Sequence, residues 1–220
     1  MKNGITKTMT GKFITFEGIE GSGKTTAARY LHEYLTKKGI ETVFTSASAS
    51  EHGTDFSRRV RAFFMEEEGM QPLHPAILAM FYMIARKDAV EHVIAPALKA
   101  GKWVICDRFD DSTMAYQGYG ANNEYMIKNF YKLSDFALEG LKPDLTFFID
   151  IPVDVSRQRI AQKTLDAMEK KVDAFFERAR KGFQAIAKDE PNRMITIDGT
   201  MSIIDVQKAL VSELGKKVKI

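Results

Sequence analysis

The chain has 220 residues, with 32 Lys and Arg against 29 Asp and Glu, and its formal net charge is +3. A hydrophobic fraction of 45% and a charged fraction of 28% are typical of a globular domain and exclude a disordered chain. Because the excess positive charge is small and spread along the chain, we expect no nucleic-acid partner.

Cysteine content and hydropathy exclude two further classes of protein. Cys106 is the only cysteine, which excludes an intrachain disulfide scaffold. The longest apolar run, 76–85, is about half as long as the roughly 20 residues that a membrane span needs. Residues 1–12 hold no apolar stretch of the kind found in secretory signals, so we expect a cytoplasmic location and no membrane partner.

Short apolar segments alternate with helix-like segments along the chain. The expected strands are 13–16, 42–45, 103–106, 145–151 and 194–197. The expected helices are 25–38, 56–65, 76–93, 154–159, 166–187 and 203–214. Continuously apolar strands are typical of a parallel sheet that is covered on both faces. The sequence therefore predicts an α/β protein, a three-layer α/β/α sandwich with a five-stranded parallel sheet.

The length predicts one domain, at about 150 residues per domain. We expect a flexible N-terminal segment over 1–11, a single domain over 12–214 and a C-terminal tail over 215–220. Within the domain we expect a short lid at about 160–169.

A phosphate-binding loop follows the first expected strand and precedes the first expected helix. Residues 18–25 match the pattern G-x-x-x-x-G-K-[ST] in the strand–loop–helix context that supports it. The residues expected to bind the ATP phosphates are Gly18, Glu20, Gly21, Ser22, Gly23, Lys24, Thr25 and Thr26. Lys24 would bridge the β- and γ-phosphates, and the Thr25 hydroxyl would bind Mg²⁺. The sequence has no N-K-x-D segment, which disfavours a GTPase.

A second polar run follows the third expected strand. Residues 107–118 read D-R-F-D-D-S-T-M-A-Y-Q-G. The carboxyl ends of parallel strands are where α/β sheets bind ligands. The Arg108 guanidinium can hold a monophosphate through two hydrogen bonds, and the Asp107 carboxylate is suited to Mg²⁺ or to its waters. We expect Lys24, Arg108 and Asp107 to be catalytic.

Together with F-E-G-I-E-G-S-G-K-T-T at 16–26, this run resembles the thymidylate kinase family of P-loop nucleoside monophosphate kinases. Segments 85–98 and 142–146 also fit, so the resemblance covers about residues 12–210. It implies transfer of the ATP γ-phosphoryl group to dTMP to give dTDP, with Mg²⁺ as cofactor and a homodimeric assembly. The partners it implies are small-molecule nucleotides.

The same resemblance implies an acceptor site for dTMP. Its expected residues are Glu20, Tyr82, Arg86, Arg108, Ser112, Thr113, Tyr116 and Gln117. Tyr82 would stack on thymine and Arg86 would hydrogen-bond the base from the same helix face. Tyr116 would press on the sugar and disfavour a 2′-hydroxyl, while Glu20 would meet the 3′-hydroxyl. Ser112 and Thr113 would read the pyrimidine edge, with Gln117 within reach of the base.

Two segments depart from the family pattern. The loop at 46–54 reads S-A-S-A-S-E-H-G-T and lacks the arginine that grips the acceptor phosphate in the family. Hydroxyls of Ser46, Ser48 or Ser50 could bind phosphate instead, and a plain flexible loop is equally compatible with this composition. The expected lid also lacks arginine, which leaves Arg157, Arg159 and Lys163 as candidates for charge stabilisation in the transition state.

These departures leave other functions open. The chain could phosphorylate another deoxynucleoside monophosphate, such as one with a modified pyrimidine, or it could be a regulatory ATP-binding module without phosphotransfer. A pure ATP switch has no use for an acceptor pocket, so Tyr82, Arg86, Ser112 and Tyr116 favour a kinase.

Overall fold

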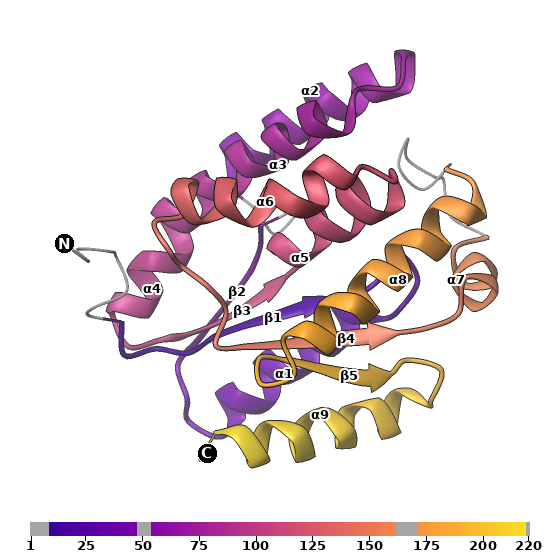
Figure 1. Cartoon of the computed structure of the whole chain (residues 1–220). Helices are drawn as coiled ribbons and strands as arrows, with labels where there is room; N and C mark the ends of the chain where they lie inside the picture. Colours follow the sequence, from indigo (N-terminus) through magenta and orange to yellow (C-terminus); the bar gives the residue numbers. More distant parts are fainter. Residues whose placement is uncertain (1–8, 48–53, 162–170, 219–220) are drawn as a thin grey trace.

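The computed structural model describes residues 9–47, 54–161 and 171–218. Five strands form one all-parallel sheet in the order β2-β3-β1-β4-β5, with helices on both faces, so the predicted three-layer α/β/α fold is confirmed (Figure 1). The strands are β1 (Phe13–Glu17), β2 (Thr42–Ser46), β3 (Trp103–Asp107), β4 (Leu145–Asp150) and β5 (Met194–Asp198). Each lies within a residue of its predicted bounds, because buried parallel strands are continuously apolar.

One face of the sheet is covered by α1 (Lys24–Lys37) and α9 (Ile203–Lys217), which lie below it in Figure 1. Leu31 and Leu35 of α1 are buried in the same core cluster as Leu210 and Leu214 of α9. Gly39 follows α1 with a left-handed backbone, φ 81°, as is common after the last residues of a helix. Helix α9 ends at Lys217, so residues 215–217, which the sequence placed in a tail, form its last turn.

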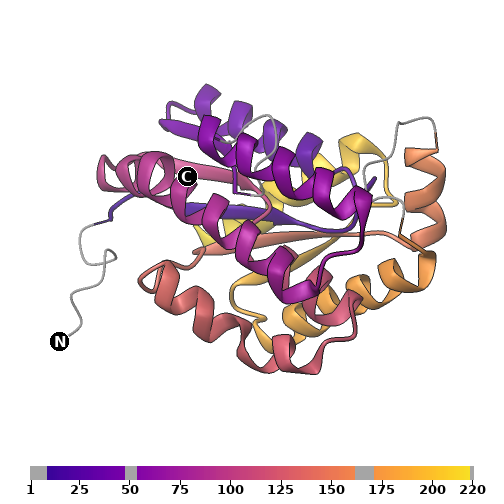
Figure 2. The same ribbon diagram turned by 90° about the horizontal axis from the view of Figure 1, so that it is seen from above.

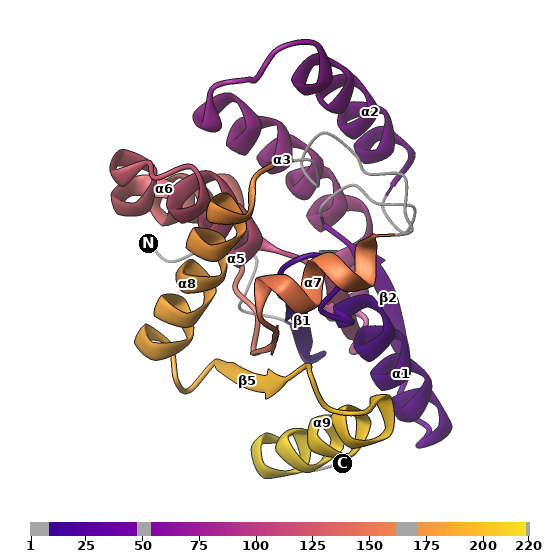
Figure 3. The ribbon, with the colours of Figure 1, turned by 90° about the vertical axis from the view of Figure 1, so that its right-hand side faces the viewer.

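The other face carries most of the remaining helices. They are α2 (Asp55–Met70), α3 (Pro75–Ala89), α4 (Ala95–Lys99), α5 (Asp110–Thr113), α6 (Glu124–Ala137) and α8 (Asp173–Asp189). Figure 3 looks at the carboxyl edge of the sheet, where α7 (Val153–Ile160) crosses in front of the strand ends. The loops that leave β1 and β3 therefore open toward α7.

The helix predicted to end at Val93 is continuous from α3 through a π-helical turn, Val90–Ile94, into α4. Pro96 lies directly after the π-helical turn and does not end the helix. The segment 56–65 likewise extends, as α2, to Met70.

Helix α6 was absent from the sequence prediction. Its signals are an N-cap, since Met126 N donates to Asn123 Oδ1 at 3.0 Å, and the buried side chains of Met126, Phe130 and Ser134 at intervals of four. A second π-helical segment, η3 (Met114–Gly120), precedes it. Helix α8 begins at Asp173 rather than at 166; residues 171–172 are not helical, and 166–170 lie outside the described residues.

Helix α8 packs closely on η3 at Gly182. A Cβ at this position would lie 2.7 Å from both Cβ and Cγ of Tyr119. We expect Gly182→Ala to lower the free energy of unfolding by about 1–3 kcal/mol, because the helix or Tyr119 must move. Thermal unfolding measures the loss, at about 2–4 °C of Tm per kcal/mol.

Gly69 of α2 is the matched control for this substitution. No atom lies within 4 Å of a Cβ at position 69, so Gly69→Ala should raise stability by about 0.5–1 kcal/mol. Equal Tm changes in the two variants would contradict close packing of α8 on η3.

Candidate active site

The phosphate loop connects β1 to the N-terminus of α1. Gly18, Gly21 and Gly23 have φ of 147°, 71° and 89°, a region that other residues rarely adopt. At Gly18 a Cβ would also lie 2.5 Å from Ile149 O. The loop therefore curls at the start of α1, where free N–H groups and the helix dipole favour a phosphate.

Lys24 folds back across this loop. Its Nζ donates to Ile19 O at 3.3 Å, and the side chain is buried. Burial lowers the pKa of Lys24, and the nearby Arg108 guanidinium lowers it further. The Lys24 ammonium group is thus placed at the mouth of the loop. A bound anion would relieve its repulsion from the Arg108 guanidinium.

Thr25 and Asp107, the two residues expected to bind Mg²⁺, contact each other. Thr25 Oγ1 donates to Asp107 Oδ2 at 2.6 Å, and the buried Asp107 Oδ1 has no hydrogen-bond partner among the described residues. No group of three or more His, Cys, Asp or Glu forms a metal centre in residues 9–47, 54–161 and 171–218. A hydroxyl beside a carboxylate with a spare oxygen fits Mg²⁺, which needs few protein ligands when phosphates and water supply the others.

Arg108 joins the phosphate loop to the segment after β3. Its Nη1 donates to Gly18 O at 3.0 Å and to Ser112 Oγ at 2.9 Å, and its Nη2 donates to Glu20 Oε1 at 2.6 Å. Burial alone would lower the pKa of Arg108, but the surrounding charges, led by the Glu20 carboxylate and joined by Tyr116, Asp107 and Glu17, together outweigh it and raise the pKa. The backbone of Arg108 is left-handed, φ 66°, which costs about 1–2 kcal/mol for a residue with a Cβ.

Glu20 is held by three partners. Besides Arg108, the Tyr116 hydroxyl donates to Glu20 Oε2, and Ser156 Oγ of α7 donates to Glu20 O at 2.7 Å. Burial would raise the pKa of Glu20, but the charges of Arg108 and Lys24 lower it below its ordinary value. Glu20 is therefore an ionised group in the centre of the site and not a solvated loop residue.

Arg86, which the sequence predicted to bind the acceptor base, is deeply buried, 1% exposed. Its Nη2 donates to Phe109 O at 2.8 Å and to Thr113 Oγ1 at 2.9 Å, and its Nη1 lies 2.9 Å from Asp110 Oδ1. The Nη1–Asp110 pair is an ion pair without hydrogen-bond geometry, so Nε and Nη1 of Arg86 are unsatisfied buried donors among the described residues. Gln117, 2% exposed, has an acceptor at Oε1 that finds no hydrogen-bond partner in the part of the chain that the structure describes.

Tyr82 lies one turn before Arg86 on α3, and its ring packs edge-on against Phe64 of α2, with centroids 4.8 Å apart. Arg61 Nη1 donates to its hydroxyl at 3.4 Å. Ser46, one of the hydroxyls considered for phosphate binding, is fully buried and donates to Asp107 O at 2.9 Å, so it is not a surface donor. Ser48, Ser50 and Lys163 lie outside the described residues.

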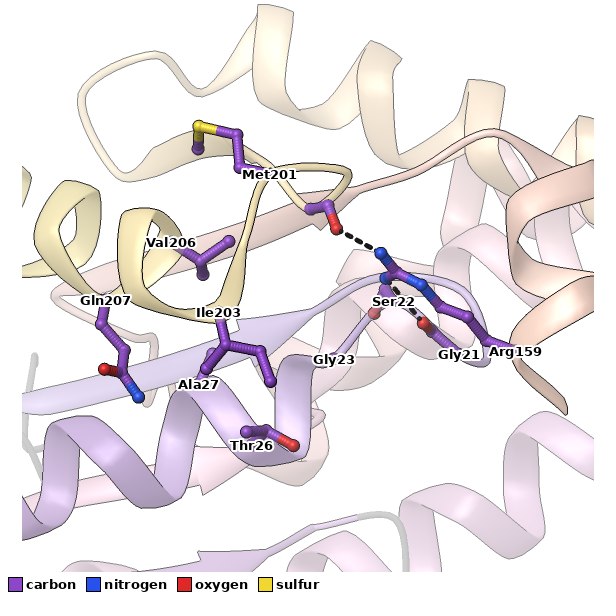
Figure 4. Close-up of a pocket in the computed structure, with 11 residues that line it drawn as sticks. Gly21, Ser22, Gly23, Thr26, Ala27, Arg159, Met201, Ile203, Val206 and Gln207 are labelled. Carbon is purple, nitrogen blue, oxygen red and sulfur yellow. Dashed lines mark hydrogen bonds between the residues drawn. The ribbon is translucent and has the colours of Figure 1, made fainter.

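The two candidate arginines of α7 have different environments. Arg157 turns to the segment before α8, where its Nε donates to Asp173 at 2.6 Å and its guanidinium lies over the Phe176 ring. Arg159 turns to the phosphate loop, donating to Gly21 O at 3.2 Å and to Gly199 O at 3.0 Å (Figure 4). Positions two apart on a helix face different directions, which separates their contacts.

A pocket of about 290 Å³ lies beside the phosphate loop (Figure 4). Its walls come from the loop and α1, from Arg159, and from the loop after β5 with the start of α9; the residues from this last part are Gly199, Met201, Ile203, Val206 and Gln207. Sequence reasoning did not find this last group. The available signal was Gly199 directly after the fifth apolar strand, at the ligand-binding edge of the sheet.

Glu17 is a second residue that sequence reasoning did not single out. It ends β1, is fully buried, and accepts from Phe109 N at 2.7 Å and from the Ser112 hydroxyl. Burial raises the pKa of Glu17 to about 7, and the Asp111 carboxylate contributes. The signal in the sequence was a carboxylate that closes an otherwise apolar strand.

A central strand followed by a phosphate loop, in a parallel sheet of this order, defines a P-loop nucleotide-binding protein of the nucleotide kinase type. Within that class, the thymidylate kinase family model matches residues 16–210. The chain therefore belongs to the thymidylate kinase family, whose members are phosphotransferases that use ATP.

Individual relatives agree with this assignment. A thymidylate kinase of Kosmotoga olearia is 39% identical over 91% of this chain and 94% of its own length. One of Nitrosomonas eutropha is 37% identical over 94% of this chain and 93% of its own. The crystal structure of thymidylate kinase from Ehrlichia chaffeensis superposes with a TM-score of 0.73 at 34% identity, covering 93% of this chain and 98% of that one.

The raised pKa of Glu17 predicts a pH-dependent contribution to stability. The unfolded chain releases this proton near the ordinary pKa of 4.5, whereas the folded chain keeps it until about 7. The ionised side chain therefore destabilises the fold increasingly as pH rises between these values, and Gln cannot ionise. We expect the Tm of Glu17→Gln, relative to wild type, to rise between about pH 5 and about pH 8. A constant Tm difference would contradict the raised pKa.

Proposed function

We infer that this protein transfers the γ-phosphoryl group of ATP to dTMP and releases ADP and dTDP. The observation that carries this conclusion is the position of Arg108. Its guanidinium is bonded both to the phosphate loop and to Ser112 on the acceptor side, so it lies between two anion-binding regions. Family membership supports the same reaction.

The donor side would hold ATP as follows. Loop amides and Lys24 would bind its phosphates, and the pocket beside Arg159 and Met201 would take the adenosine part. Thr25 and Asp107 would hold Mg²⁺, which supplies neutralisation of the phosphate charge. The in-line transfer needs no covalent enzyme intermediate, because positioning and charge stabilisation account for catalysis of this type.

The acceptor side matches a thymine base in its spare hydrogen-bonding groups. Thymine offers an acceptor at O4 and a donor at N3. The unsatisfied donors of Arg86 complement O4, and the unsatisfied Gln117 Oε1 complements N3–H. Cytosine presents the opposite pattern at these two positions and would leave buried groups unpaired, which costs about 1–3 kcal/mol for each group.

The remaining acceptor residues would position the nucleotide around that base. Tyr82 would lie against the ring, Ser112 and Thr113 would line its edge, and Arg108 would hold the phosphate. Tyr116, whose hydroxyl is bonded to Glu20, would crowd the sugar at the 2′ position. Glu20 would then accept from the 3′-hydroxyl.

We assign the donor-side cation to Arg159 rather than to Arg157. Arg159 contacts the phosphate loop and lines the donor pocket, whereas the contacts of Arg157 with Asp173 and Phe176 lie away from that loop. The altered 46–52 loop is the one feature that favours a different monophosphate as acceptor, because it lacks the family arginine.

ADP release with Mg²⁺–ATP tests the reaction against dTMP, dUMP, 5-hydroxymethyl-dUMP, dCMP, dAMP, dGMP and UMP. We expect dTMP to have the highest kcat/KM, dCMP to be lower by tenfold or more from its unpaired groups, and EDTA to abolish turnover. A better substrate than dTMP would move the assignment to that nucleotide, and no turnover with any of them would contradict a kinase.

Two arginine variants separate the two sides of the site. Arg108→Ala should lower kcat/KM for dTMP by about 10³-fold while leaving ATP affinity within a fewfold, because a cation at the transferring group is lost. Arg159→Ala, the matched control, should raise the KM for ATP and leave dTMP affinity unchanged. A loss below tenfold for Arg108→Ala would contradict its role.

We also propose a homodimer formed through an apolar patch on α2, α3 and α6, which lie side by side in Figure 2. Its exposed members recur at helical spacing, and they are Phe56, Phe63, Met70, Ile77, Met80, Ile84, Tyr125, Leu133 and Phe136. A patch over three helices is larger than monomers usually expose, and a two-fold pairing of identical patches is the commonest way to cover one.

Sedimentation velocity tests this assembly. Wild type should sediment as a dimer, and Phe63→Glu combined with Phe136→Glu should sediment as a monomer, because charges would be buried in the interface. Ile204→Glu, which changes an exposed apolar residue of α9 on the opposite face, should remain dimeric. A monomeric wild type would contradict the proposal.

No described helix is long and apolar enough to cross a membrane. Cys106 is buried and unpaired, which is compatible with the reducing cytoplasm, where we place the enzyme. Fractionation of the source cells would test this location.

A further inference from the structure

Arg108 adopts a backbone conformation that its sequence neighbours do not explain. It is one of three non-glycine residues with positive φ among the described residues, and its φ is 66°. Its own N–H donates to Phe16 O at 2.9 Å, which fixes the peptide on its N-terminal side. The peptide on its C-terminal side needs a second anchor if the left-handed conformation is to persist.

Glu17 supplies that anchor. Its Oε1 accepts from Phe109 N at 2.7 Å, and this N–H belongs to the peptide that directly follows Arg108. Both peptides that flank Arg108 are therefore tied to the last two residues of β1. A conformation that is unfavourable for an isolated residue is held by its surroundings.

The second oxygen of Glu17 acts on the Arg108 side chain. When Glu17 is ionised its carboxylate can only accept, so the Ser112 hydroxyl donates a hydrogen bond to Glu17 Oε2. A lone pair of Ser112 Oγ is then directed at Arg108 Nη1, which donates to it at 2.9 Å. One carboxylate thus sets both the backbone of Arg108 and the direction of its guanidinium.

We propose that Glu17 is the positioning residue of the acceptor site, holding Arg108 through Phe109 N and the Ser112 hydroxyl. Glu17 is fully buried, so it acts on the acceptor only through Arg108 and Ser112. The inference rests on the proposed function, in which Arg108 binds the acceptor phosphate. Glu17 would thus determine acceptor affinity without contacting the substrate.

The electrostatic surroundings of Glu17 make its burial costly. A buried carboxylate is unfavourable, and here burial and Asp111 raise its pKa to about 7 while Arg108 opposes them. Lys24 and Cys106 are the other ionisable groups whose pKa responds to Glu17. An apolar residue would avoid this cost, but it would leave Phe109 N and Ser112 without their acceptor.

The test compares dTMP and ATP affinity, by calorimetry, with steady-state kinetics for Glu17→Gln and Ser112→Ala. The Gln side chain can still accept from Phe109 N through its carbonyl oxygen. Its NH₂ group would instead donate to Ser112 Oγ, which reverses the direction of the Ser112–Glu17 hydrogen bond. We expect both variants to lose about tenfold to a hundredfold in dTMP affinity and in kcat/KM for dTMP, with the KM for ATP within twofold of wild type.

Glu68→Gln is the matched control. Glu68 is also buried and also accepts a backbone N–H, from Leu73 at 2.6 Å, but it pairs with Lys171 and has no link to Arg108. We expect this variant to keep the dTMP affinity of wild type. An equal loss of dTMP affinity in Glu68→Gln and Glu17→Gln would overturn the inference.

A double-mutant cycle separates positioning from general destabilisation. If Glu17 acts through Arg108, Glu17→Gln should reduce dTMP affinity no further in a chain that already carries Arg108→Ala. Additive losses, or an unchanged dTMP affinity in Glu17→Gln, would contradict the inference. A wild-type protein that neither binds nor phosphorylates dTMP would instead contradict the proposed function.

Discussion

The repulsion between the buried cations Lys24 and Arg108 is the constraint around which the site is arranged. Each is held by hydrogen bonds to the phosphate loop, Lys24 to Ile19 O and Arg108 to Gly18 O and Glu20. Burial lowers the pKa of Lys24, and the proximity of Arg108 lowers it further. Two cations that are fixed close together are prepared to bind anions.

Three carboxylates balance these cations, and each has a different task. Glu20 pairs directly with Arg108 and stays ionised, Asp107 keeps a free oxygen beside Thr25, and Glu17 anchors the turn that carries Arg108. All three lie at or just after the carboxyl ends of β1 and β3, which are paired neighbours in the sheet. The parallel pairing therefore brings the phosphate loop and the Asp107–Arg108 segment together before any side chain interacts.

The two nucleotide regions that we propose lie on different sides of this centre. The proposed donor pocket opens between the phosphate loop and α9, while the proposed acceptor residues come from α3, α5 and η3 on the other face of the sheet. Helix α7 crosses the carboxyl edge and contacts the phosphate loop through Arg159 and Glu20 through Ser156. Among the described residues, the unsatisfied atoms of Arg86 and Gln117 are the groups that the proposed base would complete.

The sequence by itself determined the class of fold, the phosphate loop and the Asp107–Arg108 segment, because continuous apolar strands and short motifs are local signals. It did not separate Arg157 from Arg159, whose directions depend on how α7 packs, and it missed α6, whose start depends on the Asn123 cap. Only the tertiary structure assigned tasks to Glu17 and to the residues after β5. These residues contact segments that are distant in the chain, as Glu17 contacts Phe109 and Gly199 contacts Arg159. Residue spacing in the sequence does not predict such contacts.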